Sequence, residues 1–376
     1  MFSTIEIEPK VPIFNEQSDC KNSASRPEEE AILAQRTNLK LKTIVVVCYD
    51  LTMEKYYTEH VGRVLENNKI FKHVMAITLN PQKNYEDGII RCITSREGNI
   101  FVKGYIDRSE LYTIERDSLK NYSIGEKLKI KNETEIINQI TPKGYQCIGL
   151  EDPDIWEDKD TGLIHVYFTI PFIPNEKSKK TEINLGHAVG KDLHCLLMTP
   201  PVLMDNGTMS AKEISIAPLN KKGFRYNLIE SRDRQNDTTY SVVTITIVTD
   251  MGKPWKYGET VFHPKEHRIF WIGGHASPGP FLSKNFIDLG EGKLLGIING
   301  REVNKVIDEK IKYGVFSVGL FVYDYENGKI DWVSPVPFIQ DTEARIITFA
   351  SQFIETNKGE GVLYEHVDDS FVRAYT

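Results

Sequence analysis

The chain has 376 residues, and apolar side chains make up 40% of it, enough for a large hydrophobic core. Its 46 basic and 53 acidic side chains leave a formal net charge of −7, which argues against a dedicated nucleic-acid binder because such proteins carry a basic face. The apolar runs are too short to span a bilayer, so we expect no membrane partner. The first residues lack the basic start and apolar stretch of a secretory signal, so we expect a cytoplasmic protein.

Residues 1–40 are predicted to be an N-terminal extension, and residues 41–376 the main domain. Pro27 precedes three glutamates, a pattern typical of a helix start, because Pro needs no N–H partner and acids suit the positive helix end. We therefore expect a helix from there to about Asn38. The extension could cover a pocket or contribute to a homo-oligomer, and the sequence does not decide between these roles.

Two further elements are expected before residue 70. The run Thr43 to Cys48 is apolar and β-branched, as in a buried strand. Residues 52–67 are predicted to form a helix, with Thr52 as its N-cap and Val61, Val64 and Leu65 facing inward. No Gly-rich phosphate loop follows the strand, so a nucleotide-binding fold is disfavoured.

From about residue 74 onward, short β-rich runs alternate with turns such as Asp87-Gly88, Asn206-Gly207 and Asn327-Gly328. Gly and Asn accept positive φ at little cost, so these breaks are typical of hairpins. About fifteen such runs, with almost no long helix between them, predict a large antiparallel all-β domain. Composition alone leaves a sandwich, a barrel and a propeller open.

The segment Gly149-Leu-Glu-Asp-Pro153 is the strongest candidate for chemistry. Proline favours an extended conformation in the residue before it, which would fix the direction of Asp152. Adjacent side chains on an extended chain point to opposite sides, so only one of Glu151 and Asp152 is expected to face a pocket. A carboxyl among like charges and apolar walls can act as a general acid. The alternative is an acidic surface turn.

Two other segments carry candidate anion or sugar contacts. His275 follows Gly273-Gly274 and could donate to an anion or a sugar hydroxyl; the alternative is a tight loop with a solvated histidine. Lys212 and Arg232 could hold phosphate. Glu213 and Glu230 could position a hydroxyl or a water molecule; the alternative for this group is a solvated, charged strand end.

The C-terminal run Tyr364 to Asp369 is polar where a strand is otherwise expected. Strand alternation would place Glu365, Val367 and Asp369 on one face, and His366 and Asp368 on the other. The alternative is an exposed edge or turn.

In this order, the segments resemble glycoside hydrolase family 130, the β-mannoside phosphorylases and related hydrolases. Gly149 to Pro153 is similar to the family's Gly-x-Glu-Asp-Pro-Arg motif, and Lys212-Glu213 to its Lys-Asp segment. Asn80-Pro81 with the strand end at Arg96 resembles the first blade. The later matches are Ser277 to Pro280 with Asn299-Gly300, Phe316 to Asp324, and Tyr364 to Asp368.

The resemblance implies an all-β, five-bladed β-propeller that cleaves a β-linked, mannose-containing oligosaccharide with inversion, by hydrolysis or by glycosyl transfer to phosphate. It implies Asp152 as the general acid. Hydrolysis would also need a base, for which Glu213 and Glu230 are the candidates. No metal or organic cofactor is implied, and inorganic phosphate is a conceivable co-substrate. The expected substrate contacts are Glu151, Arg96, Lys212, Arg232, His275, Asn299 and Asp368.

Three positions depart from the family pattern. Asp154 stands where the family has Arg, Asn299 stands where it has His, and Arg232 is shifted by two from the family's Arg. Arginine binds phosphate well because its planar fork meets two oxygens at once. The departures therefore leave two alternatives to an active enzyme, a catalytically silent carbohydrate-binding propeller and a protein-interaction propeller.

A propeller closes its ring by pairing strands from both chain ends in one blade. We expect the strand at Thr43 to Cys48, or its neighbour, to join the last blade with residues 361–375. An active enzyme should also offer an aromatic platform for the sugar, for which Trp156 and Trp271 are the candidates.

Overall fold

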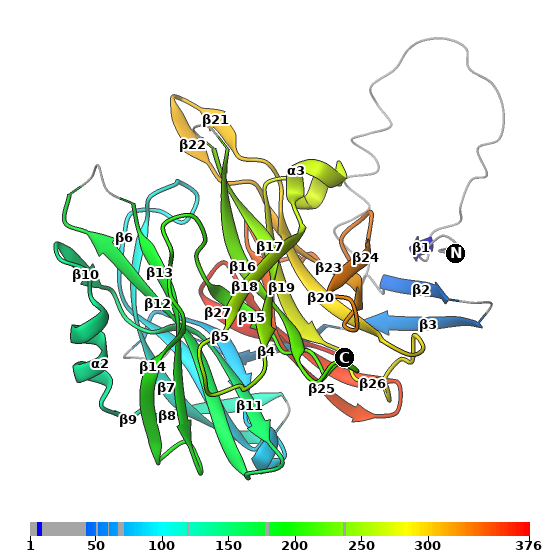
Figure 1. The fold of residues 1–376 in the computed structure, drawn as a ribbon. Coiled ribbons are helices and arrows are strands. Elements are labelled where there is room, and N and C mark those ends of the chain that lie inside the picture. The colour runs from blue at the N-terminus through cyan, green and yellow to red at the C-terminus, as the bar shows by residue number, and fades with distance from the viewer. Residues whose placement is uncertain are drawn as a thin grey trace. The chain divides into compact units, whose positions relative to one another are not determined.

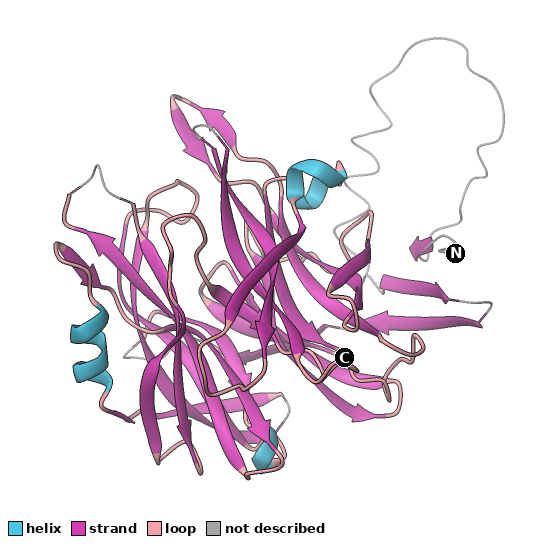
Figure 2. Ribbon diagram, in the orientation of Figure 1, coloured by secondary structure: helices cyan, strands magenta, loops and turns pink. Residues whose placement is uncertain are grey.

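The structure is a computed structural model that describes residues 6–9, 43–49, 52–58, 60–66, 71–118, 120–176, 180–235 and 238–376. Its regular structure is almost entirely β (Figure 2), with short helices at α2 (Glu133–Ile140) and α3 (Pro264–His267) and 3₁₀ turns at η1 (Pro81–Lys83) and η2 (Phe270–Ile272). No helix in the described part is long and apolar enough to cross a membrane.

The predicted five-bladed β-propeller is confirmed. Each blade is an antiparallel sheet of four main strands (Figure 1). From the innermost strand outward, blade 1 contains β5 (His73–Leu79), β6 (Asp87–Glu97), β7 (Ile106–Ser118) and β8 (Asn121–Lys127). Blade 2 contains β11 (Glu151–Asp158), β12 (Leu163–Pro174), β13 (Glu182–Gly190) and β14 (Leu196–Leu203), extended by β9 (Ile130–Lys131) and β10 (Tyr145–Cys147).

The remaining blades repeat this order. Blade 3 contains β15 (Lys212–Ser215), β16 (Arg225–Gln235), β17 (Thr238–Val248) and β18 (Lys256–Phe262). Blade 4 contains β19 (His275–Phe281), β20 (Lys293–Arg301), β23 (Phe316–Asp324) and β24 (Lys329–Val333), with the hairpin β21 (Lys305–Ile307) and β22 (Lys310–Lys312) inserted. A single bridge between Ser241 and His275 joins the sheets of blades 3 and 4.

Blade 5 closes the ring, because it combines three C-terminal strands with one strand that precedes blade 1 in the sequence. Its order is β25 (Thr348–Asn357), β26 (Glu360–Val367), β27 (Phe371–Tyr375) and then β4 (His60–Leu65). Closure by an N-terminal strand is as predicted, but the expected strand is wrong. The run at Thr43 belongs to β2 (Thr43–Tyr49), which pairs with β1 (Glu6–Pro9) and β3 (Thr52–Thr58).

The helix predicted over residues 52–67 is also wrong, because β3 and β4 occupy this range. Residues 52–58 contain Tyr56, Tyr57 and Thr58, which fit a pleated sheet better than a helix. The helix predicted from Pro27 lies outside the described residues. Residues 61–375 form one compact unit, and residues 1–60 with Thr376 form another.

The hydrophobic core of the propeller lies mainly between neighbouring blades. Pairs that share a buried cluster across such an interface are Ile77 with Tyr364, Ile89 with Val166, Tyr167 with Ile229, and Leu228 with Ile298. Sheets covered on both faces need apolar residues on both faces. This explains why β12 is a continuous apolar run rather than an alternating one.

An ionic network in blade 5 is buried at Arg373 and Asp341 and reaches the surface at Glu343 and Arg63. The Arg373 guanidinium, with a 1% exposed side chain, contacts Asp341 at 2.5 Å and Glu343 at 2.6 Å. Glu343 also pairs with Arg63 of the closing strand at 2.6 Å. Beside this network Glu365 is fully buried, and burial together with Asp341 raises the pKa of its carboxyl well above the usual range. Burial and Asp341 therefore both favour the neutral form of Glu365 in the folded protein.

This assignment makes a prediction about stability and pH. Because the pKa of Glu365 is higher in the folded than in the unfolded chain, its contribution to stability is complete below the unfolded pKa and is lost as pH rises toward the folded one. Glutamine does not ionise, so the Glu365→Gln variant does not lose stability in this way as pH rises. We expect the melting temperature of the variant, relative to wild type, to increase from pH 5 to pH 8. Glu360→Gln, an exposed change on the same strand, should leave the difference constant across this range.

Candidate active site

The innermost strand of every blade changes register at one comparable place. The five register shifts lie at Met75/Thr78, Glu151/Asp154, Lys212/Ile214, Pro278/Phe281 and Ala350/Gln352. A bulge of this kind leaves a residue unpaired and re-aims its side chain. Residues from all five segments line one axial cavity of about 170 Å³. The repeated bulge therefore turns side chains of all blades toward the axis.

Two neighbouring bulges carry carboxyl groups, Asp152 in blade 2 and Glu213 in blade 3. Both residues have left-handed backbone conformations, with φ of 47° and 46°. The expectation that Pro153 keeps Asp152 extended is wrong, because the bulge overrides this local preference. Glu151 and Asp152 both contact Arg91, and of the two only Asp152 lines the axial cavity, which agrees with the expectation that one of them faces a pocket.

Gly149 brings this segment against blade 1. Its φ is 133°, and a Cβ atom there would lie 2.0 Å from the carbonyl oxygen of Ser109, so only glycine fits. The Ser109 hydroxyl then donates to Glu151 at 3.3 Å and accepts from Arg91 Nε at 3.1 Å. The close approach of the Gly149 and Ser109 backbones thus sets the distance from Arg91 to Glu151 and Asp152.

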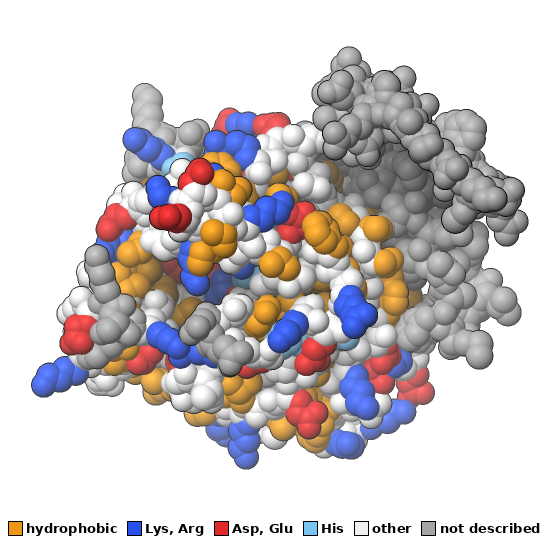
Figure 3. All heavy atoms as spheres, turned by 90° about the horizontal axis from the view of Figure 1, so that it is seen from above, with side chains coloured by type: hydrophobic (Ala, Val, Ile, Leu, Met, Phe, Trp, Pro, Cys, Tyr) orange, Lys and Arg blue, Asp and Glu red, His pale blue; other side chains and the backbone are white. Residues whose placement is uncertain are grey.

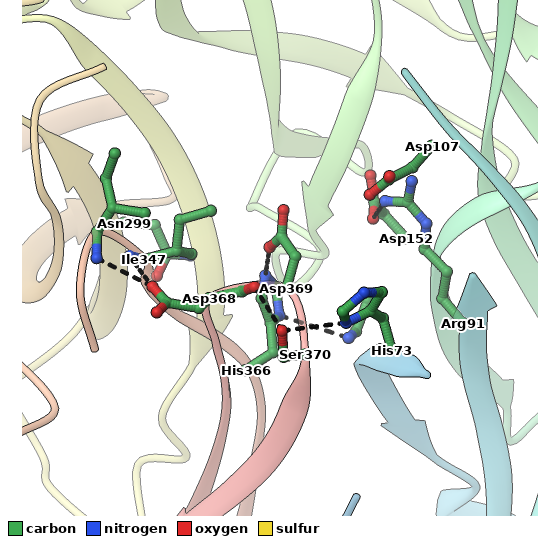
Figure 4. Close-up of polar contacts among 12 residues, drawn as sticks. His73, Arg91, Asp107, Asp152, Asn299, Ile347, His366, Asp368, Asp369 and Ser370 are labelled. Carbon is green, nitrogen blue, oxygen red and sulfur yellow. Dashed lines mark hydrogen bonds and ion pairs between the residues drawn. The ribbon is translucent and has the colours of Figure 1, made fainter. Parts of the chain in front are cut away.

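Arg91 is the central cation of the site. Its Nη2 lies 2.7 Å from Glu151 and its Nη1 lies 2.8 Å from Asp152, and the side chain is 10% exposed (Figure 4). The Asp107 carboxyl lies beside the same guanidinium in Figure 4 and is held by Arg96 at 2.7 Å. Burial outweighs the attraction of Arg91 and, with Asp152, raises the pKa of Glu151 to about 7.

Asp152 and Glu213 share a hydrogen bond between their carboxyl groups. Burial raises the pKa of Glu213 well above its usual range, and the adjacent Asp152 raises it further. Two buried carboxyls in contact cannot both be ionised without a large electrostatic cost. Burial and this contact therefore favour a proton on the pair. This is the chemical equipment of a general acid.

A second group lies next to this pair. The Glu230 carboxylate is 3.1 Å from His275 Nε2 and 3.7 Å from Lys212 Nζ. Burial opposes ionisation of Glu230, but His275 and Lys212 outweigh it and hold its pKa at about 2. Burial lowers the pKa of His275, which opposes a positive charge on its ring. Lys212 is the other cationic partner of Glu230. The structure thus brings together four predicted residues, Lys212, Glu213, Glu230 and His275.

Arg301 is a site residue that sequence reasoning missed. It is paired directly with His275 in the β19–β20 register and is 9% exposed. Its guanidinium lies over the rings of Tyr313 and Phe316, at 4.5 Å and 5.3 Å. Within the described residues no carboxylate forms an ion pair with it, and its buried Nε has no hydrogen-bond partner. A buried cation of this kind suits an anionic ligand.

The rim next to Arg301 is aromatic. Val102 of blade 1 forms a β-bridge with Lys312 of the blade 4 insertion, and Tyr313 N donates to Phe101 O at 3.2 Å. Tyr105 and Tyr313 meet edge to face across this junction. Seen from above, the face that carries β21 and β22 is hollowed, and basic side chains lie in the hollow (Figure 3).

The two tryptophans expected as a sugar platform differ in position. Trp156 lines the axial cavity and lies under the guanidinium of Arg225 at 5.4 Å. Trp271 is 5% exposed in the core of blade 4, and its indole donates to Ser334 O at 3.0 Å. Trp156 therefore remains a candidate sugar platform, whereas Trp271 is a packing residue.

Asp368, the expected sugar contact, and its neighbour Asp369 have different positions. Asp368 accepts hydrogen bonds from the backbone N–H groups of residues 345–347 at 2.9–3.1 Å and from Arg345 Nε, so it orders a loop. Asp369 instead contacts His366 at 3.3 Å (Figure 4). It also accepts a hydrogen bond from the Tyr105 hydroxyl at 3.2 Å. The predicted alternation is wrong for this pair, because both aspartates have left-handed φ in a turn.

Of the other predicted substrate contacts, Arg96 lies near the site and Arg232 does not. Arg96 lies at the edge of the cluster, bound to Asp107 and to the carbonyl oxygen of Asp369 at 3.2 Å. Arg232 is directed elsewhere, to Asp205 and to the carbonyl oxygen of Thr181 at 2.8 Å. Asp154 bonds to Thr78 further along the axial cavity, and burial raises its pKa to about 7.

Asn299 is part of the scaffold and is not free to contact substrate. Its amide donates to Ala350 O at 3.0 Å and accepts from Ala350 N at 2.8 Å, which ties blade 4 to the bulge of blade 5. Both polar atoms are thereby used in the buried interface.

Arg91, Asp107, Asp369 and Arg301 were not singled out from the sequence. A usable signal existed for Arg91, which is a lone charge inside the apolar run Gly88 to Ile93. Charged residues are seldom fully buried without a partner, so such a position points to a specific interaction. No group of three or more metal-ligating side chains occurs among the described residues.

No protein-family model matches the sequence. No curated protein matches it either. Solved structures do match. A candidate glycosidase from Bacteroides thetaiotaomicron is 15% identical over 85% of this chain and 88% of its own, with a TM-score of 0.58. A family 130 structure, from work on hydrolases that target β-1,2 mannosidic linkages in Candida mannan, is 14% identical over 85% and 86%, with a TM-score of 0.56.

A third structure has the same fold. The β-1,2-mannobiose phosphorylase from Listeria innocua is 14% identical over 89% of this chain and 85% of its own, with a TM-score of 0.50. The fold is that of the family 130 propellers. At these identities the comparison establishes the architecture, and the chemistry must come from the site.

The assignment of Asn299 to the scaffold can be tested by its removal. Asn299→Ala leaves the N–H and C=O of Ala350 buried and unpaired, so we expect a loss of about 2–4 kcal/mol in the free energy of unfolding. Urea denaturation measures this loss. Asn121→Ala, at an exposed strand end, should change it by less than about 0.5 kcal/mol. If Asn299→Ala were as stable as wild type, Asn299 would again be a candidate ligand contact.

Proposed function

We propose that this protein is a carbohydrate-active enzyme that cleaves a β-linked, mannose-containing oligosaccharide with inversion, with Asp152 as the general acid. The observation that carries the proposal is the proton-holding pair of Asp152 and Glu213 at the axial cavity, beside Arg91. Neighbours in fold space are described as mannoside phosphorylases and as hydrolases of β-1,2 mannosidic linkages, which supports the substrate class.

The acid step follows from the charge arrangement. A carboxylic acid protonates the leaving glycosidic oxygen while the attacking group approaches C1 from the opposite face of the sugar. A proton held in a buried pair at neutral pH is available for this transfer. Arg91 and Lys212 lie close enough to offset the negative charge that the pair gains when it releases the proton.

The attacking group differs between hydrolysis and phosphorolysis. In hydrolysis a carboxylate must accept a proton from water. Of the two expected bases, Glu213 already holds a proton, which leaves Glu230 as the candidate. Its low pKa makes it a weak proton acceptor, so hydrolysis by this route would be slow.

Phosphorolysis needs an anion site and no base. Lys212, His275 and Arg301 together provide donors for an oxyanion, and Arg301 has no carboxylate partner within the described residues. These residues could replace the family cations that are absent at Asp154 and Asn299. Inorganic phosphate is thus the favoured co-substrate, and the proposal includes no further cofactor. A cytoplasmic location and a homo-oligomer belong to the proposal as expectations that cell fractionation and light scattering test.

The proposal predicts sugar release from a panel of β-mannosides, measured with and without inorganic phosphate. We expect sugar 1-phosphate to appear only with phosphate, and Asp152→Asn to abolish its formation. Asp160→Asn, an exposed change on the same blade, is the matched control and should retain wild-type turnover. Release without phosphate, also lost in Asp152→Asn, would indicate hydrolysis. Absence of turnover in every condition would favour the silent binding propeller.

The anion site has its own test. Arg301→Met keeps contact with the rings of Tyr313 and Phe316 but removes the charge. A charge-assisted hydrogen bond contributes about 1.5–3 kcal/mol, so we expect the KM for phosphate to rise about 10- to 100-fold. Steady-state kinetics with varied phosphate measure the change. Arg234→Met, on blade 3, should leave the KM for phosphate unaltered, and an unaltered value in Arg301→Met would remove Arg301 from the site.

A further inference from the structure

The carboxyl pair contains two acids but only one direct cation contact. Arg91 Nη1 lies 2.8 Å from Asp152, whereas Lys212 is directed to Glu230 at 3.7 Å. Within the described residues no Lys, Arg or His forms an ion pair with Glu213. The two members of the pair are therefore electrostatically unequal, although they share one hydrogen bond.

The cation determines which member is ionised. A carboxylate beside a guanidinium is stabilised as the anion, and a buried carboxyl without a cation is stabilised as the neutral acid. Asp152 is thus the acceptor of the shared hydrogen bond and Glu213 is its donor. Burial and the adjacent Asp152 outweigh the opposing attraction of Lys212 and raise the pKa of Glu213, in agreement with the geometry.

We propose that the proton of the acid step resides on Glu213 and reaches the leaving oxygen through Asp152, so that Glu213 is a positioning residue that supplies the general acid. The inference rests on the proposed function, and it concerns where the proton is kept. A family pattern in which Asp152 acts alone would not require Glu213 to be an acid.

The proton balance of the step is simple. Glu213 first passes its proton to Asp152, and Asp152 gives this proton to the leaving oxygen as the C1–oxygen bond breaks, which returns Asp152 to a carboxylate beside Arg91. The new bond forms between C1 and the oxygen of the attacking group, which supplies the electron pair. Glu213 is left as a carboxylate near Lys212, and it regains a proton from solvent after the products leave.

The kinetic test compares leaving groups in Glu213→Gln. Glutamine keeps a hydrogen bond to Asp152 but has no transferable proton. Removal of acid catalysis should lower kcat/KM for an unactivated β-mannoside by about 10²–10⁴-fold. A 2,4-dinitrophenyl β-mannoside needs no protonation of its leaving group, so its loss should stay below about 10-fold. The alkaline limb of the pH profile should disappear in the variant. Glu259→Gln, at an exposed site of blade 3, should match wild type on both substrates.

Three results would overturn the inference. These are equal losses on both substrates, wild-type activity of Glu213→Gln on the unactivated mannoside, and an unchanged alkaline limb. If wild type turns over no substrate, the proposed function fails, but the location of the proton can still be measured. The infrared difference spectrum of wild type minus Glu213→Gln at pH 7 should then contain the C=O stretch of a protonated carboxylic acid. Absence of this band would contradict the inference independently of activity.

Discussion

One buried guanidinium sets the electrostatics of the whole axial site. Arg91 stands in the second strand of blade 1 and binds both acids of the blade 2 bulge, at 2.7 Å and 2.8 Å. It lies against Asp152, and Asp152 in turn helps to raise the pKa of Glu213 of blade 3. Removing a buried partner of such a pair is far costlier than removing an exposed one, because a charge is left without compensation. The cation in blade 1 thereby influences the charge of the carboxyl groups of Asp152 in blade 2 and Glu213 in blade 3.

The site divides into an acidic half and a basic half. Arg91, Glu151, Asp152 and Glu213 form the half that handles a proton, and Lys212, Glu230, His275 and Arg301 form the half that can meet an anion. The division follows the order of the blades, since the first group comes from blades 1 to 3 and the second from blades 3 and 4.

Hairpin turns and β-rich runs are local signals, so the residues alone predicted a large antiparallel all-β domain, and the resemblance to family 130 implied the propeller. The sequence also predicted the residues at the bulges of blades 2 and 3, through the motifs around Asp152 and Glu213. It could not predict the bulge itself, since a left-handed Asp152 before Pro153 contradicts local preference and is imposed by pairing with β12. The position of Asp369 in the cluster was missed for a similar reason, as a turn replaced the assumed alternation. Arg232 and Asn299 were misjudged because their partners, Asp205 and Ala350, are distant in sequence.

The closing strand β4 has a consequence for how the chain reaches this structure. Arg63 and Glu343, in contact across blade 5, are separated by 280 positions in the chain. Contacts of such separation carry a large loop-closure entropy and form late. During synthesis the blade 1 face that packs against Tyr364 would remain uncovered until the last strands leave the ribosome. An exposed apolar face of this kind promotes aggregation, so the newly made chain is a natural client for molecular chaperones.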